Sequence, residues 1–444
     1  MTLLTVAAGA GFAVMASRSM RLRREVKKVV TRWNERTLER HREEQQKIPV
    51  PVLPKVESVE RPPDWPRFLG PTGDGIVRAR LKSLPWPASG PRVLWKQPIG
   101  GGQGSFLIAA GRACTIEQRG EDEVVACYAL NSGRELWTYR YRAHFTTGMG
   151  PPGPRSTPTI AGGRLYAQGA TGVLTCLDAT TGKLIWRRNI LEDTEAKNLY
   201  WGMAATPLVA SGRLYAAPGG EQGGLIAYDP ATGAPLWTSG KRTAGYSSPI
   251  LAQLAGVPHL LVFDGEGLTA YNPDDGAERW HHPWKTEFGV NAAQPIVVDQ
   301  EHVLISSGYG RGASLLRVDR HEAGIQVQPV WENINLKLKY TSGVLKDDHV
   351  YGADDTIFAC LNVRTGERAW KGGRYGSAHV LLAGGYLLIQ CENGDLALLE
   401  ASPREYRELS RIPALDGATA NSPAAGEGKL IVRNGKEMIC FALD

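Results

Sequence analysis

From Asp64 to the C-terminus, apolar and polar residues alternate over short stretches that are separated by glycine-rich turns. Examples are "AGGRLYAQGA" (161–170) and "SGRLYAAPGG" (211–220). Successive side chains of a β-strand point to opposite faces, so this alternation predicts short strands that are buried on one face. Helical periodicity is almost absent from this part of the chain. We therefore expect residues 64–444 to be all-β.

One phrase returns many times in this region, with the form Ala-x-Asp-x-x-x-Gly-x-x-x-Trp. It reads "LDATTGKLIW" at 177–186, "YDPATGAPLW" at 228–237, "YNPDDGAERW" at 271–280 and "LNVRTGERAW" at 361–370. An Asp or Asn side chain caps the backbone of a tight turn, and glycine supplies the positive φ at its end. The Trp on the outgoing strand offers a large face for packing against a neighbouring unit. Each phrase therefore predicts a β-hairpin.

The recurring positions of the phrase, including a diverged copy that ends at Trp331, define the expected structural residues. These are Asp178 and Asp229; Gly133, Gly182, Gly233, Gly276 and Gly366; and Trp95, Trp137, Trp186, Trp237, Trp280, Trp331 and Trp370.

A second pattern marks the start of another strand between successive phrases. The eight starts are "GSFLI" (104–108), "STPTI" (156–160), "ATPLV" (205–209), "SSPIL" (247–251), "AQPIV" (293–297), "TSGVL" (341–345), "GSAHV" (376–380) and "NSPAA" (421–425). Their spacing of roughly 35 to 52 residues is typical of propeller blades with four short strands each.

The two ends of the repeated region complement each other. The final copy stops at "CFALD" (440–444) before any Trp, whereas Trp95 in "PRVLWKQPIG" (91–100) has no phrase of its own. If Trp95 supplies the outer strand of the last unit, every unit is complete and no sheet edge is left open. We expect an eight-bladed β-propeller of four-stranded antiparallel blades, closed by pairing of its N- and C-terminal strands.

The repeated phrase resembles the PQQ-like (pyrroloquinoline-quinone-type) β-propeller repeats. The stretch "DWPRFLGPTGDGIV" (64–77) is similar to the start of such domains in many bacterial envelope proteins. The resemblance covers residues 64–444, and the family includes quinoprotein dehydrogenases and outer-membrane assembly factor B-like proteins. One fold serves many tasks, so the resemblance implies the propeller and leaves the function open.

A dehydrogenase of this family would need bound PQQ, a Ca²⁺ ion held by oxygen ligands and an aspartate base. Many such enzymes also carry two adjacent cysteines, and this chain has no adjacent pair among its six. The chain also lacks long insertions between blades. We therefore expect no cofactor and no metal site, with PQQ and Ca²⁺ as the alternative, and we assign no catalytic residue.

The cysteines show no metal-binding spacing, and three of them, Cys127, Cys176 and Cys360, occupy the same small position ten residues before a repeat Trp. A free cysteine in such a position behaves as a small apolar residue. All six are expected to be structural thiols.

The segment before the propeller divides into three parts. Residues 1–17 are apolar and fit a membrane anchor or a signal segment, residues 18–47 fit a charged helical stalk, and residues 48–63 form a proline-rich linker. The net charge of +6 lies wholly in residues 1–63, which hold 13 Lys and Arg against 7 Glu. The propeller region is neutral, so no nucleic-acid partner is expected.

Loops that precede the innermost strands of a propeller surround one mouth of its channel. Several of these loops, such as "HFTTGMGPPGPR" (144–155) and "LEDTEAKNLYWGM" (191–203), are longer or more aromatic than a connection requires. Exposed Tyr, Trp and Arg are enriched on recognition surfaces. The expected mouth residues are His144, Arg155, Tyr200, Trp201, Tyr246, Asn291, Tyr309, Arg311, Tyr340, Tyr375 and Asn421.

Together these features favour a non-enzymatic scaffold that binds a protein partner in the bacterial cell envelope, with the propeller on the periplasmic side of a membrane anchor. One alternative is a PQQ-dependent oxidoreductase. The other is a carbohydrate- or small-metabolite-binding protein that uses the aromatic mouth.

Overall fold

The computed structural model describes residues 35–47, 49, 51–56, 64–79, 81–148, 150–322 and 324–444. The expected anchor (1–17), residues 18–34 of the expected stalk and residues 57–63 of the linker lie outside the described residues. Glu35–Lys47 form the helix α2. No helix within the described ranges is both long and apolar enough to cross a bilayer.

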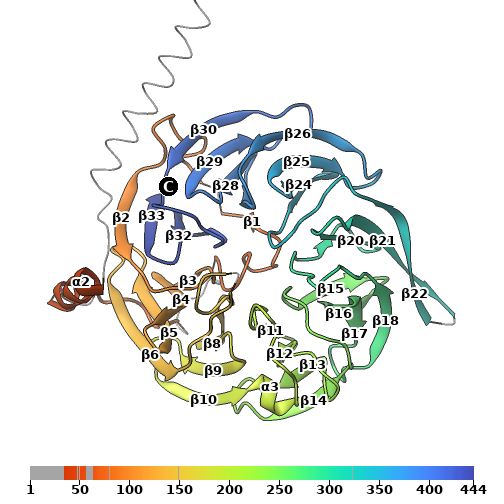
Figure 1. The fold of residues 1–444 in the computed structure, drawn as a ribbon, viewed down its shortest axis with the longest axis horizontal. Coiled ribbons are helices and arrows are strands. Elements are labelled where there is room, and N and C mark those ends of the chain that lie inside the picture. Colours follow the sequence, from red (N-terminus) through yellow and green to blue (C-terminus); the bar gives the residue numbers. More distant parts are fainter. Residues whose placement is uncertain are drawn as a thin grey trace, which may run out of the picture.

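From Asp64 onward, the described chain forms eight antiparallel blades around a channel, which confirms the predicted fold (Figure 1). Blades 1 and 2 consist of β3 (Leu107–Ala109), β4 (Arg112–Arg119), β5 (Asp122–Ala129) and β6 (Glu135–Arg142), and of β7 (Thr159–Ala161), β8 (Arg164–Gln168), β9 (Val173–Asp178) and β10 (Leu184–Asn189). The short helix α3 (Ile190–Asp193) follows β10. Blades 3 and 4 consist of β11 (Leu208–Ala210), β12 (Arg213–Ala216), β13 (Leu225–Tyr228) and β14 (Pro235–Ser239), and of β15 (Ile250–Leu254), β16 (Val257–Phe263), β17 (Gly267–Tyr271) and β18 (Glu278–Pro283).

The remaining four blades follow the same order. Blades 5 and 6 consist of β19 (Ile296–Val297), β20 (His302–Ser307), β21 (Gly312–His321) and β22 (Gly324–Asn333), and of β23 (Val344–Lys346), β24 (His349–Asp354), β25 (Ile357–Asn362) and β26 (Arg368–Arg374). Blade 7 consists of β27 (His379–Ala383), β28 (Tyr386–Gln390), β29 (Asp395–Glu400) and β30 (Glu408–Pro413), and blade 8 of β31 (Ala424–Gly426), β32 (Lys429–Arg433), β33 (Glu437–Ala442) and β2 (Val93–Pro98).

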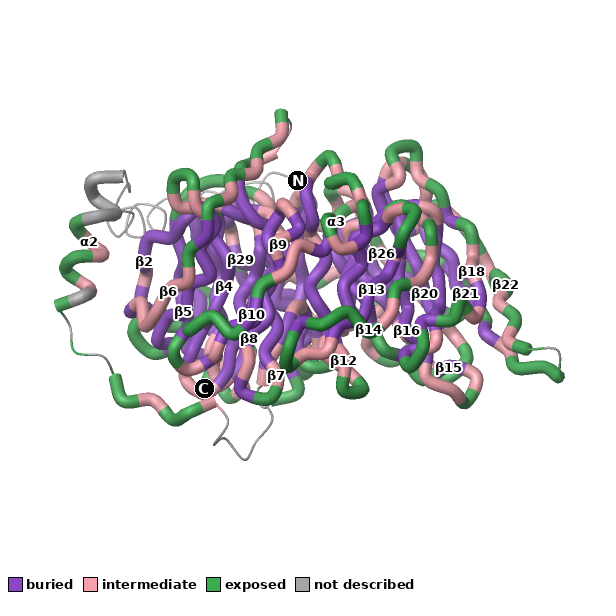
Figure 2. The backbone as a smooth tube through the Cα atoms, turned by 90° about the horizontal axis from the view of Figure 1, so that it is seen from below, coloured by how far each residue is buried: buried purple, intermediate pink, exposed green. Residues whose placement is uncertain are grey.

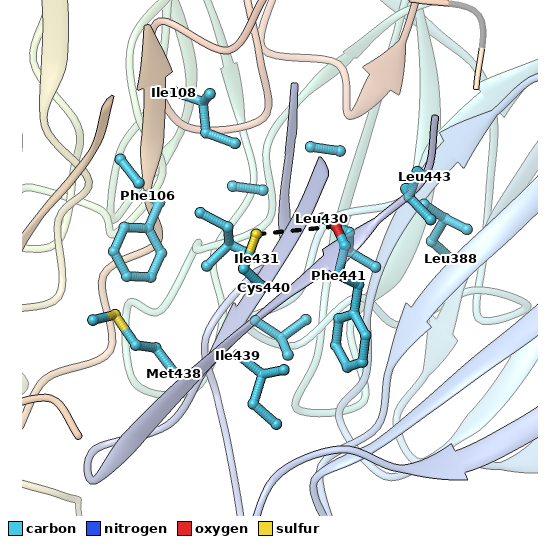
Figure 3. Packing of buried hydrophobic residues seen from close by; sticks show 14 of the residues in the cluster. Phe106, Ile108, Leu388, Leu430, Ile431, Met438, Ile439, Cys440, Phe441 and Leu443 are labelled. Carbon is cyan, nitrogen blue, oxygen red and sulfur yellow. Dashed lines mark hydrogen bonds between the residues drawn. The ribbon is translucent and has the colours of Figure 1, made fainter. Parts of the chain in front are cut away.

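Strands from the two ends of the repeated region close the ring, as the sequence predicts. β2 is the outer strand of blade 8 because it pairs antiparallel with β33, and Trp95 lies opposite Cys440. Beside this closure, Phe106 of the entry loop to blade 1, Leu388 of blade 7 and Ile431 of blade 8 belong to one buried apolar cluster (Figure 3). The closure therefore joins three blades through a common core.

Five repeat Trp residues pack against the turn glycine of the next blade: Trp95, Trp137, Trp186, Trp237 and Trp331. A Cβ on Gly182 of blade 2 would lie 2.4 Å from the Trp137 ring of blade 1, so only glycine fits this approach. In the same turn, Asp178 Oδ1 accepts hydrogen bonds from the backbone N–H groups of Thr180 (3.1 Å) and Thr181 (2.7 Å). The Asp and Gly of the phrase thus shape a turn that receives the preceding Trp.

Blade 7 has Ser410 at the position where other blades carry their Trp, opposite Leu398. The Oγ of Ser410 accepts a hydrogen bond from Nε1 of Trp86, whose ring is buried. Trp86 comes from the segment before β2. An indole from outside the repeat therefore fills the position that this blade leaves vacant.

The expectation of six free thiols is wrong for two of them. Cys114 on β4 and Cys127 on β5 are directly opposite each other, with their Cα atoms 4.0 Å apart, and they form a disulfide. Cysteines in different blades are too far apart to bridge, but this pair lies in adjacent strands of one blade. Cys176, Cys360, Cys391 and Cys440 are free and buried.

In the side view, the buried strands form a layer between two rims of more exposed turns (Figure 2). One rim carries the loops that lead into the innermost strands, among them α3. The opposite rim carries the C-terminus and the turns that join the first to the second and the third to the fourth strand of a blade. These two rims define the two mouths of the channel.

Candidate binding surface at the channel mouth

The Ser, Thr and Gln residues at the strand starts link neighbouring blades around the channel. The N–H of Ser105 donates to Thr157 Oγ1 (2.9 Å), that of Thr157 to Thr206 Oγ1 (3.3 Å), and that of Thr206 to Ser248 Oγ (2.8 Å). In the same way, the N–H of Ser248 donates to Gln294 Oε1 (3.2 Å), and the N–H of Gln294 donates to Ser342 Oγ (3.1 Å). The second sequence pattern therefore encodes inter-blade hydrogen bonds, which hold the inner strands in a ring.

The segment 64–77 crosses the channel at the rim that carries the C-terminus. Trp65 bridges Ile108 near the end of β3, and the N–H of Ile160 donates to the carbonyl of Pro66 (2.9 Å). On the other side, β1 (Ile76–Val77) pairs in parallel with β27 (Figure 1). Because this segment contacts the far ends of the inner strands, the mouth at the entry loops is the one left for a ligand or partner.

Aromatic side chains from successive entry loops lie along that mouth. The ring centroids of Tyr200 and Trp201 are 4.8 Å apart, and those of Trp201 and Tyr246 are 5.8 Å apart, both in edge-to-face geometry. Further along, Phe288 and Tyr309 are 5.5 Å apart, also edge to face. We call the set Phe145, Tyr200, Trp201, Tyr246, Phe288, Tyr309 and Tyr340 the mouth arc.

The mouth arc combines exposure with fixed geometry. Tyr200, Phe288 and Tyr340 expose 57%, 61% and 37% of their surface. Burial raises the pKa of Tyr246, and it also raises the pKa of Tyr309, so both phenols stay protonated and able to donate hydrogen bonds. Rigid aromatic rings of this kind give a large contact area at a low cost in conformational entropy.

Two cationic side chains lie in the mouth arc and have no ion pair among the described residues. Arg155 lies over the Phe145 ring at 5.1 Å and donates to the carbonyls of Gly153 (2.5 Å) and Pro151 (3.1 Å). Burial lowers the pKa of Arg155 to about 10. Lys339 Nζ lies 5.2 Å from the centre of the Tyr309 ring. The arc therefore offers positive charge beside aromatic faces.

The structure places other predicted mouth residues away from an accessible mouth. Asn291 is fully buried, and its amide donates to the carbonyls of Asp264 (2.7 Å) and Trp284 (3.0 Å). Asn421 is buried and donates to the carbonyl of Gly104 (2.9 Å), which joins blade 8 to blade 1. The binding interpretation is wrong for these two residues, because their amides are used by backbone groups.

Tyr375 and Arg311 also lie apart from the arc. Tyr375 is buried, with its hydroxyl 2.6 Å from the hydroxyl of Tyr406, so the interpretation of this residue as a mouth contact is wrong as well. Arg311 lies over the Trp284 ring at 3.5 Å and pairs with Glu332. His144 is exposed, and its Nδ1 lies 3.0 Å from the carbonyl of Gly120.

Phe145 and Phe288 of the mouth arc, and Lys339 beside it, are absent from the sequence prediction. Phe145 and Phe288 lie in loops whose unusual length or aromatic content the sequence already indicates, "HFTTGMGPPGPR" (144–155) and "KTEFGVN" (285–291). Whether these side chains can contact a partner depends on their exposure, and the exposure depends on how neighbouring loops pack.

The carboxylates near the mouth do not fit a Ca²⁺ site of the kind that a PQQ enzyme needs. Glu123 accepts hydrogen bonds from the Tyr141 hydroxyl (2.6 Å) and the Ala170 N–H (3.0 Å). Asp264 accepts from the Thr269 hydroxyl (2.6 Å) and from two backbone N–H groups. Within the described residues no three His, Cys, Asp or Glu side chains gather as metal ligands would.

The fold and the repeats define a PQQ-like eight-bladed propeller with an aromatic mouth. Residues 121–372 match the family model described as "Outer membrane protein assembly factor BamB", and the chain belongs to this family. The protein of that name from Burkholderia pseudomallei (strain K96243) is 26% identical over 278 residues, a match that spans 53% of this chain and 70% of the relative.

Two solved structures match a larger share of this chain. BamB from Moraxella catarrhalis has a TM-score of 0.55 at 17% identity, over 79% of this chain and all of that chain (100%). Quinohemoprotein alcohol dehydrogenase from Comamonas testosteroni has a TM-score of 0.63 at 14% identity, over 88% of this chain and 83% of that chain. At these identities, both likenesses show the fold alone.

Proposed function

We propose that this protein is a non-enzymatic scaffold of the bacterial cell envelope that binds a protein partner through the mouth arc. The exposed rings of Tyr200, Phe288 and Tyr340 carry this proposal, because exposed aromatic residues in a fixed arrangement are typical of protein-binding surfaces. Membership of a family described as an outer membrane assembly factor supports a partner in the envelope.

For the cellular location, we propose that the propeller is periplasmic and is tethered by the apolar residues 1–17. The family name supports the envelope, and the apolar run supports the tether. We propose no cofactor. The support is that Glu123 and Asp264 are already hydrogen-bonded to neighbouring groups of the protein, which leaves an unsuitable donor set for Ca²⁺.

Site-specific photo-crosslinking in cells tests the proposed surface. A photoreactive phenylalanine analogue is placed at Tyr200 or Phe288, and a control analogue is placed at Leu236, an exposed apolar residue of β14 on the perimeter. We expect one envelope protein to be cross-linked from the two mouth positions but not from position 236. The adduct should also be lost when Trp201→Ala and Tyr309→Ala are introduced together.

Adducts that form from position 236 alone, or that survive the double substitution, would contradict the mouth as the partner surface. A separate titration with PQQ and Ca²⁺ tests the enzyme alternative. We expect no saturable change in Trp fluorescence. Saturable binding with dye reduction on addition of an alcohol or sugar would establish a dehydrogenase instead.

A further inference from the structure

Three cationic side chains surround one carboxylate at the edge of blade 6. Asp354, at the end of β24, is fully buried, and its two oxygens contact the ammonium groups of Lys337 and Lys371. Arg368 Nη2 lies 3.3 Å from Asp354 Oδ2. Asp355 is 3.5 Å from Lys337 and is the second carboxylate of the cluster. Three positive charges therefore meet two negative ones, with a surplus of one positive charge.

A β-bulge of the repeat brings two of these cations together. Arg368 and Lys371 are three residues apart on β26, which would place them on opposite faces of a regular strand. The pairing of β25 with β26 shifts between Cys360, opposite Trp370, and Leu361, opposite Arg368. The extra residue in β26 puts Arg368 and Lys371 on the same side, where both reach Asp354 Oδ2.

The hydrogen bonds of the cluster leave donors free on Arg368 and Lys371. Arg368 Nε and Nη2 donate to the carbonyl of Asn335 (3.3 and 3.0 Å), and no hydrogen bond of the described residues uses Nη1. Among the described residues, the ammonium of Lys371 bonds only to Asp354, so it can donate two more hydrogen bonds. Asp354 Oδ1 also accepts from the Lys337 N–H (3.1 Å), so each of its oxygens already has two donors.

Arg368 and Lys371 are both held by Asp354 and both remain accessible to solvent. Their side chains remain 33% (Arg368) and 27% (Lys371) exposed, whereas Asp354 is inaccessible. Partly buried charges are screened less by salt than fully exposed ones, and the buried carboxylate restricts where the cations can move. A guanidinium edge next to an ammonium group is suited to an anion with several oxygens.

We propose that Arg368 and Lys371 form a binding site for a phosphate group, with Asp354 and Lys337 as positioning residues. The free Nη1 of Arg368 and the ammonium of Lys371 donate to different oxygens of one phosphate. A soluble phosphate compound and a phospholipid headgroup present the same chemistry. The site lies outside the mouth arc and does not depend on the function proposed for it.

Calorimetric titration of the full-length protein with inorganic phosphate tests the site. We expect binding at one site that Lys371→Gln or Arg368→Gln weakens about tenfold, because each removes a charged donor. Arg368→Lys keeps the charge but loses the forked guanidinium, so its affinity for phosphate should lie between that of the wild type and that of Arg368→Gln. Lys346→Gln is the matched control, since Lys346 pairs with the exposed Asp347 in a hairpin turn of the same blade and should leave binding unchanged. Melting temperatures verify that each variant is folded.

Vesicle competition identifies the source of the phosphate. If phosphatidylglycerol vesicles displace inorganic phosphate and phosphatidylcholine vesicles do not, the ligand is an anionic lipid headgroup. If neither displaces it, the ligand is a soluble phosphate. Both results support the site. Absence of saturable phosphate binding, or equal binding by the wild type and a folded Lys371→Gln variant, would overturn it.

Discussion

Glycines with the same backbone conformation serve two different purposes in this ring. Gly182 and Gly212 both have φ near +72°, which side-chain-bearing residues adopt at a cost. A Cβ on Gly182 would meet the Trp137 ring, whereas a Cβ on Gly212 would meet no atom within 4 Å. Backbone strain is therefore common to both positions, and the requirement for close packing applies only to Gly182.

This difference predicts unequal effects of alanine. Gly212→Ala should lower the free energy of unfolding by about 1 kcal/mol through φ alone, and Gly182→Ala should lower it by roughly 2 kcal/mol more because the Trp must move. The measurement is the melting temperature of both variants beside the wild type. Equal shifts would show that the Trp contact sets no packing constraint.

A buried histidine links stability to pH. Burial lowers the pKa of His379 on β27 to about 4, and its Nε2 has no partner within the described structure. The unfolded chain therefore binds a proton at higher pH than the folded protein does. The contribution of this group to stability is complete above its unfolded pKa of about 6.5 and is lost as the pH falls toward 4.

We expect His379→Gln to make stability less sensitive to acid between pH 7 and pH 4.5. Urea unfolding at several pH values measures this slope for the variant, for the wild type and for His321→Gln, a control at the exposed end of β21. Asp264 acts in the opposite direction, because burial raises its pKa to about 6 and the folded state gains stability on protonation. Asp264 is present in the wild type and in both variants, so its effect cancels when their slopes are compared. An unchanged slope in His379→Gln would contradict the assignment.

At the scale of single elements, the β4–β5 hairpin has a cross-link that is absent from the other blades of the described chain. Cys114 and Cys127 are joined within this hairpin, whereas the four free cysteines are buried elsewhere. Burial raises the pKa of Cys176, Cys360, Cys391 and Cys440 to about 12, so few thiolates are present at neutral pH. A thiol reagent should distinguish the two groups.

Protein that is expressed with export to the periplasm should therefore react with Ellman's reagent in three stages. We expect almost no reaction in the native state, four thiols after unfolding without reductant, and six after unfolding and reduction. Peptide mapping should recover Cys114 linked to Cys127. Six reactive thiols without reductant would show that the disulfide does not form in that compartment.

At the scale of the whole molecule, ring closure depends on one outer strand that comes from the other end of the repeated region. Trp95 on β2 is buried, and its Nε1 donates to the carbonyl of Leu130 in blade 1 at 2.9 Å. This side chain therefore fixes β2, the outer strand of blade 8, against the turn of blade 1. Trp237 makes the same kind of contact, to the carbonyl of Asp274 at 3.0 Å, between two blades of consecutive strands.

We expect Trp95→Ala to lower the free energy of unfolding by about 3–5 kcal/mol and to open the ring at its closure first. Hydrogen exchange should accelerate in β2 and β33 before other strands. In the matched variant Trp237→Ala, the acceleration should be confined to β13, β14 and the neighbouring blade. Similar exchange of β33 in both variants would show that the closure is no weaker than any other junction.

The sequence by itself determined the blade. The spacing of Asp, Gly and Trp is local, because a turn and its flanking strands lie within about a dozen residues. The eight strand starts between the phrases, together with the unmatched Trp95, therefore specify eight blades and their closure. Five predicted residues that the structure brings together in the mouth arc are Tyr200, Trp201, Tyr246, Tyr309 and Tyr340. They lie in loops whose length and composition are also local features.

Only the tertiary structure decided which side chains remain accessible and which meet across strands. Asn291, Tyr375 and Asn421 stand in the expected loops but are buried, because backbone groups or residues of other blades use their polar atoms. The Cys114–Cys127 pair and the cation cluster on Asp354 depend on strand register and on a bulge, and Trp86 fills a position far along the chain. No repeated spacing in the sequence links the residues that make these contacts, so only the folded ring shows that they meet.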